Sequence, residues 1–192
     1  MSGVVPREPA DDAAAEVVRL LTAARSTLAV AESLTGGIVA AAVVDVPGAS
    51  VVLRGAVVAY ATDLKADLLG VAKDLLTAHG AVHPEVALAM ARGVRTRLRA
   101  TWGVATTGVA GPDPQDGRPP GEYHVAVVGP GVGVSRSFAP AGPGSRAQVR
   151  IAARDAALEL LVEALRDEAL GADAASGTDA ESGTGGAPVA LH

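Results

Sequence analysis

The sequence predicts an α/β protein, with a three-layer α/β/α arrangement around a mixed sheet of about five strands. Segments with helical apolar spacing alternate with short apolar runs of strand length along most of the chain. A hairpin pattern around a Gly-Pro-Gly turn adds antiparallel strands near the end of this region. Apolar residues make up 49% of the 192 residues, which is enough for one packed core.

The first half of the chain alternates helix and strand twice. Residues 13–24 carry apolar side chains at helical spacing, and residues 27–31 form an apolar run of strand length. Residues 37–44 are apolar and rich in alanine, and a Pro-Gly pair follows them as a breaker. The valine pairs in residues 51–60 are typical of a buried strand.

Three helices and three strands follow before a long final helix. The predicted helices are 64–69, 72–78 and 84–98, the last opened by a proline at its first position. The predicted strands are 102–107, 123–128 and 132–138. Residues 146–170 form an amphipathic helix, for which Ser145 and Gln148 supply a capping box. This order places helices on both faces of the sheet.

The two ends of the chain differ in composition from the middle. Residues 1–12 form a short flexible lead-in with two prolines, without the basic and apolar layout of a signal peptide. Residues 171–192 contain mostly Gly, Ala, Ser and Thr with three acids, which predicts a disordered acidic tail. We find no apolar run long enough to span a membrane, so we expect a cytoplasmic protein.

Composition excludes several classes of chemistry. The chain has no cysteine, which excludes disulfides, thiolate nucleophiles and iron–sulfur clusters. A net charge of -5 and 2% aromatic residues argue against nucleic acid as a partner. We therefore expect a small-molecule substrate, with no nucleic acid and no membrane as partner.

The segment 31–37 joins an apolar strand to a helix and offers two hydroxyls and two glycines. Ser33 is a candidate nucleophile. The glycines Gly36 and Gly37 let a ligand approach the backbone, and the free amides at the helix start can hold a phosphate or a developing oxyanion. The alternative is that Ser33 or Thr35 only caps the helix.

A lysine follows the next strand, at the start of another helix. If Thr62 caps that helix, Lys65 lies in its first turn, where the helix dipole favours the neutral amine. Lys65 is therefore a candidate general base for Ser33. Tyr60 either bridges this pair or only fills the strand. The alternative for Lys65 is that its side chain bends away into water.

A third group of candidates combines a loop after a strand with the start of the final helix. Thr107 and Gly108 end a strand, and Arg146 lies at a helix N-terminus, where an arginine can clamp a phosphate or carboxylate. Arg150 is expected to be a solvated helix residue. The Pro-rich and Gly-rich segment 111–121 is either a lid or a solvated linker.

Familiar signatures of other enzyme classes are absent from the sequence. It contains no Walker loop, no G-x-G-x-x-G after a strand and no G-x-S-x-G. Tyr60 and Lys65 are five residues apart, one too many for the pair of short-chain reductases. His79 and His83 need not share a helical face, so we expect no metal site.

Several motifs in order resemble the C-terminal domain of the CinA family, from about residue 13 to 168. The motifs are AESLTGG at 31–37, GAVVAY at 55–60 followed by Lys65, HGAV at 79–82 and TGVAGPD at 107–113. The resemblance implies the CinA C-terminal-domain fold. Members of this type, also called PncC, are nicotinamide-nucleotide amidohydrolases of pyridine nucleotide recycling, which convert nicotinamide mononucleotide to nicotinate mononucleotide and ammonia.

The resemblance also implies roles for individual residues. Ser33, Lys65 and Tyr60 match the family's serine, lysine and tyrosine, which suggests a serine–lysine amidase without metal or cofactor. Lys65 would deprotonate Ser33 directly or through Tyr60. Residues 35–37 would supply amides, Thr107 and Gly108 would line the pocket, and Arg146 would hold the 5′-phosphate.

This sequence departs from the family pattern at three positions. The family usually has Ser where His83 stands, Asp where Ser145 stands, and Lys-Pro where Arg118-Pro119 occurs. These departures affect the expected rim of the pocket and the substrate preference. The short lead-in resembles the stand-alone form of the domain, and family members commonly form homo-oligomers, dimers or larger.

Two other functions remain open on the sequence. The same pocket can belong to a binding module that senses a nucleotide or mediates a competence-related protein contact without turnover. An amidase for another small carboxamide fits the same residues.

Overall fold

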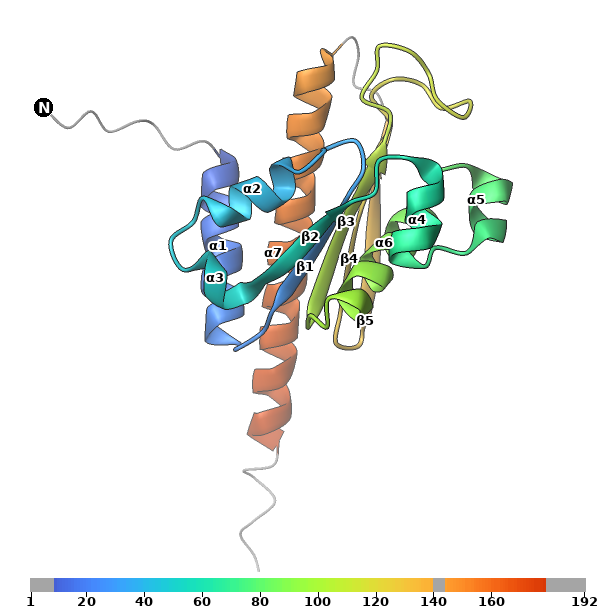
Figure 1. Cartoon of the computed structure of the whole chain (residues 1–192). Helices are drawn as coiled ribbons and strands as arrows, with labels where there is room; N and C mark the ends of the chain where they lie inside the picture. Colours follow the sequence, from blue (N-terminus) through green and yellow to red (C-terminus); the bar gives the residue numbers. More distant parts are fainter. Residues whose placement is uncertain (1–8, 140–143, 179–192) are drawn as a thin grey trace, which may run out of the picture.

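The structure is a computed structural model that describes residues 9–139 and 144–178. A five-stranded sheet lies between two layers of helices (Figure 1). The strands are β1 (Leu28–Glu32), β2 (Leu53–Val58), β3 (Trp102–Gly108), β4 (Tyr123–Gly129) and β5 (Val132–Phe138). The helices are α1 (Pro9–Ala23), α2 (Ile38–Val44), α3 (Ala49–Val52), α4 (Thr62–Leu69), α5 (Lys73–His79), α6 (Pro84–Arg97) and α7 (Arg146–Thr178).

The sheet is mixed, as the sequence predicts. Its strand order is β2-β1-β3-β4-β5, in which β1 runs parallel to β2 and β3. β4 is antiparallel to β3, and β5 is antiparallel to β4. Glu32, at the end of β1, is in register with Val58 of β2 and Thr106 of β3, so the three parallel strands finish at one edge of the sheet.

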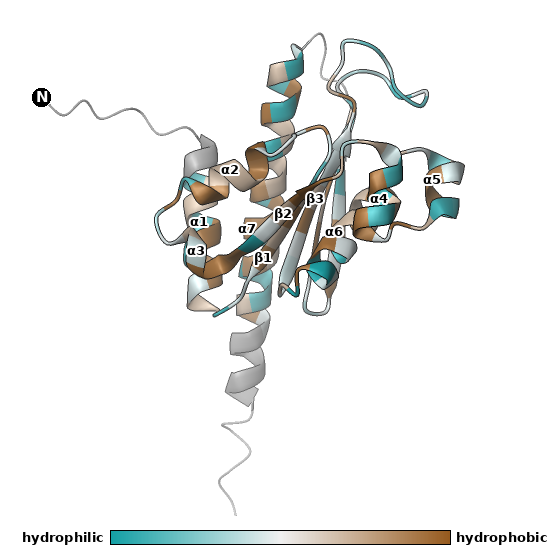
Figure 2. Cartoon of the chain, viewed as in Figure 1, coloured by the Kyte–Doolittle hydropathy of each residue, from teal (hydrophilic) through white to brown (hydrophobic). Residues whose placement is uncertain are grey.

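Alternation along β1 divides the core into two parts. Leu28 and Val30 face α1, α2 and α7, whereas Ala29 and Ala31 face α6 and α4. Because successive side chains of a strand point to opposite faces, a central strand that is buried on both faces is apolar along most of its length, and β1 is apolar from Leu28 to Ala31. Figure 1 shows the two helical layers, and Figure 2 shows that the loop between β3 and β4 is mostly hydrophilic.

The sequence-based prediction of a buried strand over 51–60 is wrong in two respects. Residues 49–52 form the short helix α3, and β2 starts only at Leu53. β2 is also an edge strand in which more buried and more exposed residues alternate, so Val58 is 43% exposed. Valine pairs favour a strand, but they do not determine its place in the sheet.

The predicted boundaries at both ends of the domain also shift. Helix α1 begins at Pro9, inside the predicted lead-in 1–12, and α7 continues to Thr178, beyond the predicted end at residue 170. Residues 171–178 contain three alanines, which favour a helix, but also two glycines, which do not, so their composition does not predict where the helix ends. The rest of the predicted disordered tail, 179–192, lies outside the described residues.

Candidate active site

Loops from three parallel strands meet the start of α7 at one edge of the sheet. Ligands of α/β proteins gather at this edge because loop amides and helix N-termini converge there. A cavity of about 100 Å³ lies at this place. It is lined by Ser33, Leu34, Tyr60, Gly108, Val109, Ala110, Gly111, Asp113, Gln115 and Arg146.

The structure brings the predicted serine and lysine together. Ser33 follows β1 directly, and Lys65 lies in the first turn of α4. The Lys65 Nζ is 3.1 Å from the Ser33 Oγ, and Lys65 is only 1% exposed. The N-terminal residue before the helix is Ala61, without a side-chain cap, so Thr62 is the first helical residue rather than the predicted cap. Lys65 nevertheless points inward and not into water.

Burial controls the protonation of Lys65. Desolvation lowers the pKa of its amine from 10.5 to about 8, although the negative charges of Asp116 and Asp63 oppose this shift. A pKa near 8 leaves a usable fraction of neutral amine at neutral pH. An ordinary lysine at the same pH is almost entirely protonated.

The hydrogen-bond partners of Lys65 fix how the neutral amine is oriented. Its Nζ also lies 2.9 Å from the Ala59 carbonyl oxygen and 3.3 Å from the Tyr60 carbonyl oxygen. Carbonyl oxygens only accept hydrogen bonds, so these two contacts use two N–H groups. A neutral amine has two N–H groups and one lone pair. As an ammonium, Lys65 donates its third N–H to the Ser33 Oγ. When that proton is lost, the lone pair takes its place and faces the Ser33 hydroxyl, which is the arrangement that a general base requires.

The helix-start amides expected to hold a ligand are mostly used within the protein. The buried Glu32 carboxylate accepts hydrogen bonds from the amides of Gly37 (2.8 Å), Val39 (3.2 Å) and Ala40 (2.9 Å). The Gly36 amide donates to the Ser33 carbonyl at 3.1 Å. A buried carboxylate needs such donors, and the helix N-terminus supplies them. The prediction that Gly36 and Gly37 give amides to a ligand is therefore wrong.

Glycine conformation shapes this turn. Gly36 and Gly37 have φ values of +62° and +104°, in the left-handed region that favours glycine. The two residues let the chain turn from β1 into α2 while the Glu32 side chain caps the helix. Sequence reasoning included Glu32 in the motif but gave it no role, because a glutamate at a strand end looks exposed until the strand is known to be central.

Two predicted threonines use their hydroxyls inside the protein. The Thr35 hydroxyl lies 2.7 Å from that of Thr106, and the Thr107 hydroxyl donates to the Ala81 carbonyl at 2.7 Å. Both threonines are buried, and neither side chain lines the cavity. The expectation that Thr107 lines the pocket is thus not met.

Gly108 does line the cavity, and its place requires glycine. A Cβ at this position would lie 2.5 Å from the Cβ of Tyr123 and 2.6 Å from the Glu122 carbonyl oxygen. The backbone of β3 therefore approaches β4 too closely here for a larger residue.

Tyr60 and Arg146 form the rim of the cavity. The Arg146 guanidinium donates to the Gly111 carbonyl at 2.6 Å and to the Tyr60 hydroxyl at 2.7 Å. The Tyr60 side chain is 57% exposed. Lys65 contacts Ser33 directly, so the Tyr60 hydroxyl does not bridge the pair, and only its carbonyl contacts the lysine.

Arg150 is not the solvated residue that the sequence suggested. Its Nε donates to the Leu34 carbonyl at 3.1 Å, and its Nη2 donates to the Thr35 carbonyl at 2.7 Å. The only sequence signal for this contact is its spacing of four residues from Arg146, which places both arginines on one face of α7.

The three departures from the family pattern have visible structural roles. The His83 Nδ1 accepts a hydrogen bond from the Glu85 amide at 3.3 Å and caps α6, as a serine would. Ser145 and Gln148 exchange the two hydrogen bonds of the predicted capping box. Arg118 donates to the Glu122 carboxylate at 3.3 Å.

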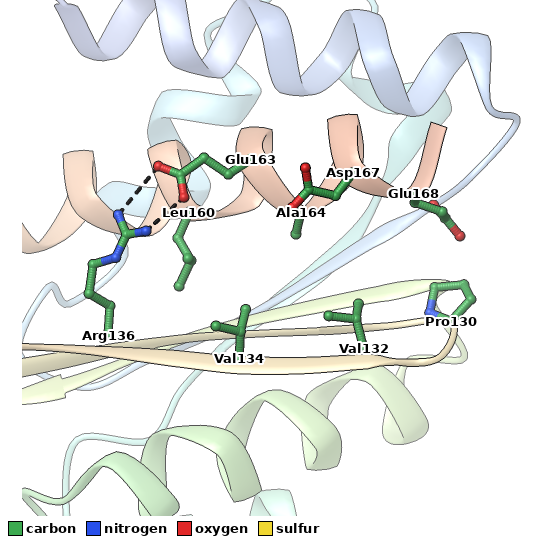
Figure 3. Close-up of a pocket in the computed structure, with 9 residues that line it drawn as sticks. All are labelled: Pro130, Val132, Val134, Arg136, Leu160, Glu163, Ala164, Asp167 and Glu168. Atoms are coloured by element: carbon green, nitrogen blue, oxygen red, sulfur yellow. Dashed lines mark hydrogen bonds and ion pairs between the residues drawn. The ribbon is translucent and has the colours of Figure 1, made fainter. Parts of the chain in front are cut away.

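A second cavity, of about 410 Å³, lies between β5 and α7 (Figure 3). It is lined by Pro130, Val132, Val134, Arg136, Leu160, Glu163, Ala164, Asp167 and Glu168. Arg136 and Glu163 form an ion pair of 2.7 Å across it. This set of residues holds neither a hydroxyl nor an amine, so it cannot perform the chemistry available beside Ser33.

Two further kinds of feature are absent from residues 9–139 and 144–178. No cluster of three or more His, Asp or Glu side chains there is arranged to hold a metal ion. Helices in the same ranges are all too short or too polar to cross a membrane.

Comparison with known proteins identifies the family. The CinA C-terminal domain family matches residues 10–165. A CinA-like protein of Frankia casuarinae is 52% identical over 153 residues, which are 79% of this chain and 35% of that protein. The chain thus spans about a third of the length of the curated relatives that it matches.

Solved structures agree with this assignment. The competence/damage inducible protein CihA of Agrobacterium tumefaciens superimposes with a TM-score of 0.77 and 34% identity, over 85% of this chain and 99% of that one. A CinA superfamily protein of Klebsiella pneumoniae has a TM-score of 0.77 and 28% identity, over 82% of this chain and 98% of that one. This chain therefore belongs to the CinA C-terminal domain family.

Proposed function

We propose that this protein hydrolyses the carboxamide of nicotinamide mononucleotide, giving nicotinate mononucleotide and ammonia in pyridine nucleotide recycling. One observation carries the proposal. A buried lysine amine, with its pKa lowered to about 8, lies 3.1 Å from a serine hydroxyl at the edge of a cavity. Family membership supports a CinA-type domain, and the substrate and mechanism are the proposed part.

The chemistry follows from the two side chains. The Lys65 amine takes the proton of the Ser33 hydroxyl while the Ser33 oxygen forms a bond to the carboxamide carbon. The tetrahedral intermediate then collapses with cleavage of the C–N bond, and the lysine ammonium returns the proton to the leaving ammonia. Water, deprotonated by the same amine, hydrolyses the resulting ester and regenerates Ser33.

The charges at the cavity suit a substrate that carries both signs. Nicotinamide mononucleotide has a cationic ring and an anionic phosphate. Arg146 uses two of its five N–H groups on Gly111 and Tyr60 among the described residues, so others remain for an anion. Asp113 lines the same cavity and supplies a carboxylate that complements the cationic ring.

The test is an assay of ammonia and nicotinate mononucleotide release from nicotinamide mononucleotide. We expect turnover by the wild-type protein and a loss of at least about 10³-fold in Ser33→Ala and Lys65→Ala, because each removes an atom that takes part in the reaction. Lys73→Ala is the matched control, since Lys73 is the other lysine of the chain and lies outside the cavity. Treatment with a chelator should leave the rate unchanged.

Three outcomes would contradict different parts of the proposal. Full activity in Ser33→Ala or Lys65→Ala would refute the dyad. Equal turnover of nicotinamide riboside, which lacks the phosphate, would refute the role of Arg146 and favour another small carboxamide. Binding of the nucleotide without turnover by folded wild-type protein would favour a sensor or interaction module.

A further inference from the structure

We propose that Arg150 is a positioning residue for the reaction at Ser33, because it orients the peptide groups that follow the nucleophile. This inference rests on Ser33 being the nucleophile of the proposed function. Arg150 lies in the second turn of α7, more than 100 residues away from Ser33 in the sequence. It does not line the cavity and so acts through the turn and not on the substrate.

In the turn after β1, some backbone groups form hydrogen bonds within the protein and others do not. The Ser33 amide donates to the Thr106 carbonyl at 3.1 Å, and the Ser33 carbonyl accepts from Gly36 at 3.1 Å. The carbonyls of Leu34 and Thr35 accept from Arg150. Within the part of the chain that the structure describes, the amides of Leu34 and Thr35 have no hydrogen-bond partner. These two N–H groups come directly after the nucleophile.

The geometry of the peptide bond links Arg150 to one of these amides, that of Thr35. In a trans peptide the C=O and N–H groups point in opposite directions. The Leu34 carbonyl points to Arg150, so the Thr35 N–H of the same peptide points away from Arg150. An N–H on the residues after a nucleophile is a donor for the negative oxygen that develops when the nucleophile attacks. Arg150 thus keeps this peptide from rotating and turning a carbonyl toward that oxygen.

The contact requires an arginine and leaves little free space. Two carbonyl oxygens of consecutive residues are held by separate nitrogens of one planar guanidinium, which a lysine cannot reproduce. The guanidinium also packs against the turn, because a Cβ on Gly36 would lie 3.4 Å from the Arg150 Nη2.

The experiment measures the reactivity of Ser33 without any assumed substrate. A fluorophosphonate probe reacts with Ser33 as the serine oxygen bonds to phosphorus, fluoride leaves and Lys65 takes the proton. The second-order labelling rate is followed by intact mass in the wild type, Arg150→Ala and Arg150→Lys. Arg154→Ala is the matched control, since Arg154 is one turn further along α7 and donates to Asp155, not to the turn.

We expect both Arg150 variants to label about 10- to 100-fold more slowly than the wild type, because misaligned donors are weaker than aligned ones but are not removed. Arg154→Ala should label within about twofold of the wild type. Urea denaturation followed by the fluorescence of the single tryptophan, Trp102, shows whether each variant is folded at the assay condition. The pH midpoint of labelling should stay near that of the wild type, because Lys65 is unchanged.

Separate results overturn the inference and the proposed function. A folded Arg150→Ala or Arg150→Lys that labels at the wild-type rate overturns the inference. If Arg150→Ala is folded but slow, millimolar methylguanidinium should restore part of its labelling rate, and failure of this rescue also counts against the inference. Wild-type protein that labels at Ser33 but does not deamidate the nucleotide refutes only the substrate. Absence of labelling at Ser33 in the wild type contradicts both.

Discussion

Replacing Lys65 with methionine should change how the stability of the protein depends on pH. Methionine has a similar length but no charge, so it occupies the same buried position without titrating. Lysine ordinarily has a pKa of 10.5, whereas burial lowers the pKa of Lys65 to about 8. Below pH 8 the amine is protonated in both the folded and the unfolded protein, and the folded state bears the cost of a buried ammonium.

The two pKa values set the size of the effect. One pKa unit corresponds to about 1.4 kcal/mol, so burial of the ammonium costs the folded state about 3 kcal/mol below pH 8. Between pH 8 and 10.5 the unfolded chain holds this proton and the folded protein does not. Stability therefore rises with pH across this window. From pH 7 to pH 10, the wild type should gain roughly 2 to 3 kcal/mol relative to Lys65→Met.

Urea denaturation at pH 7, 8.5 and 10 measures this difference directly. Trp102 is fully buried and is the single tryptophan, so its fluorescence reports unfolding. Burial raises the pKa of Tyr123, but this tyrosine titrates in both proteins and its effect cancels in the difference. Lys73→Met is the control, because it makes the same replacement of lysine by methionine at an exposed position. A difference between wild type and Lys65→Met that is flat from pH 7 to 10 would refute the reasoning.

Two further predictions concern the same site. The kcat/KM of the wild type for nicotinamide mononucleotide should rise about tenfold per pH unit below pH 8 and level off above about pH 9, because only the neutral amine of Lys65 accepts a proton; a rate independent of pH from 6 to 9 would contradict this role. Glu32→Gln should lower the free energy of unfolding by about 2 to 3 kcal/mol. The glutamine side chain has only one acceptor oxygen, and its NH₂ group would face a backbone N–H group at the start of α2 that needs an acceptor. Urea denaturation measures this loss beside the exposed control Glu159→Gln, for which we expect a change within about 0.5 kcal/mol, and equal midpoints for the two variants would count against it.

The sequence by itself determined most of the order of elements and indicated the two candidate side chains at the centre of the site. Apolar periodicity along the chain reports local structure, so the alternation of helices and strands could be predicted. Ser33 and Lys65 could be predicted because each follows a strand, and the carboxyl ends of parallel strands meet at one edge of the sheet. That rule needs only the order of elements and no distances.

The position of a strand within the sheet could not be predicted in the same way. A valine-rich segment suits both a central and an edge strand. The tertiary structure shows that β2 is an edge strand, because it pairs with β1 and with no other strand of the described sheet. The short helix α3 was missed for a related reason. Its four residues include two valines, which favour strands. The turn at Gly48, directly before the helix, overrides this preference.

Tertiary structure alone decided which polar groups of the site are free. Glu32 uses the amide of Gly37, Arg146 uses the Tyr60 hydroxyl, and Arg150 uses the Leu34 carbonyl. The last pair is 116 residues apart in the sequence. A hydrogen bond forms only where donor and acceptor approach within about 3 Å, and local sequence does not fix such distances between distant segments. The sequence therefore identified the residues at this edge of the sheet, and packing determined which of them remain available for a substrate.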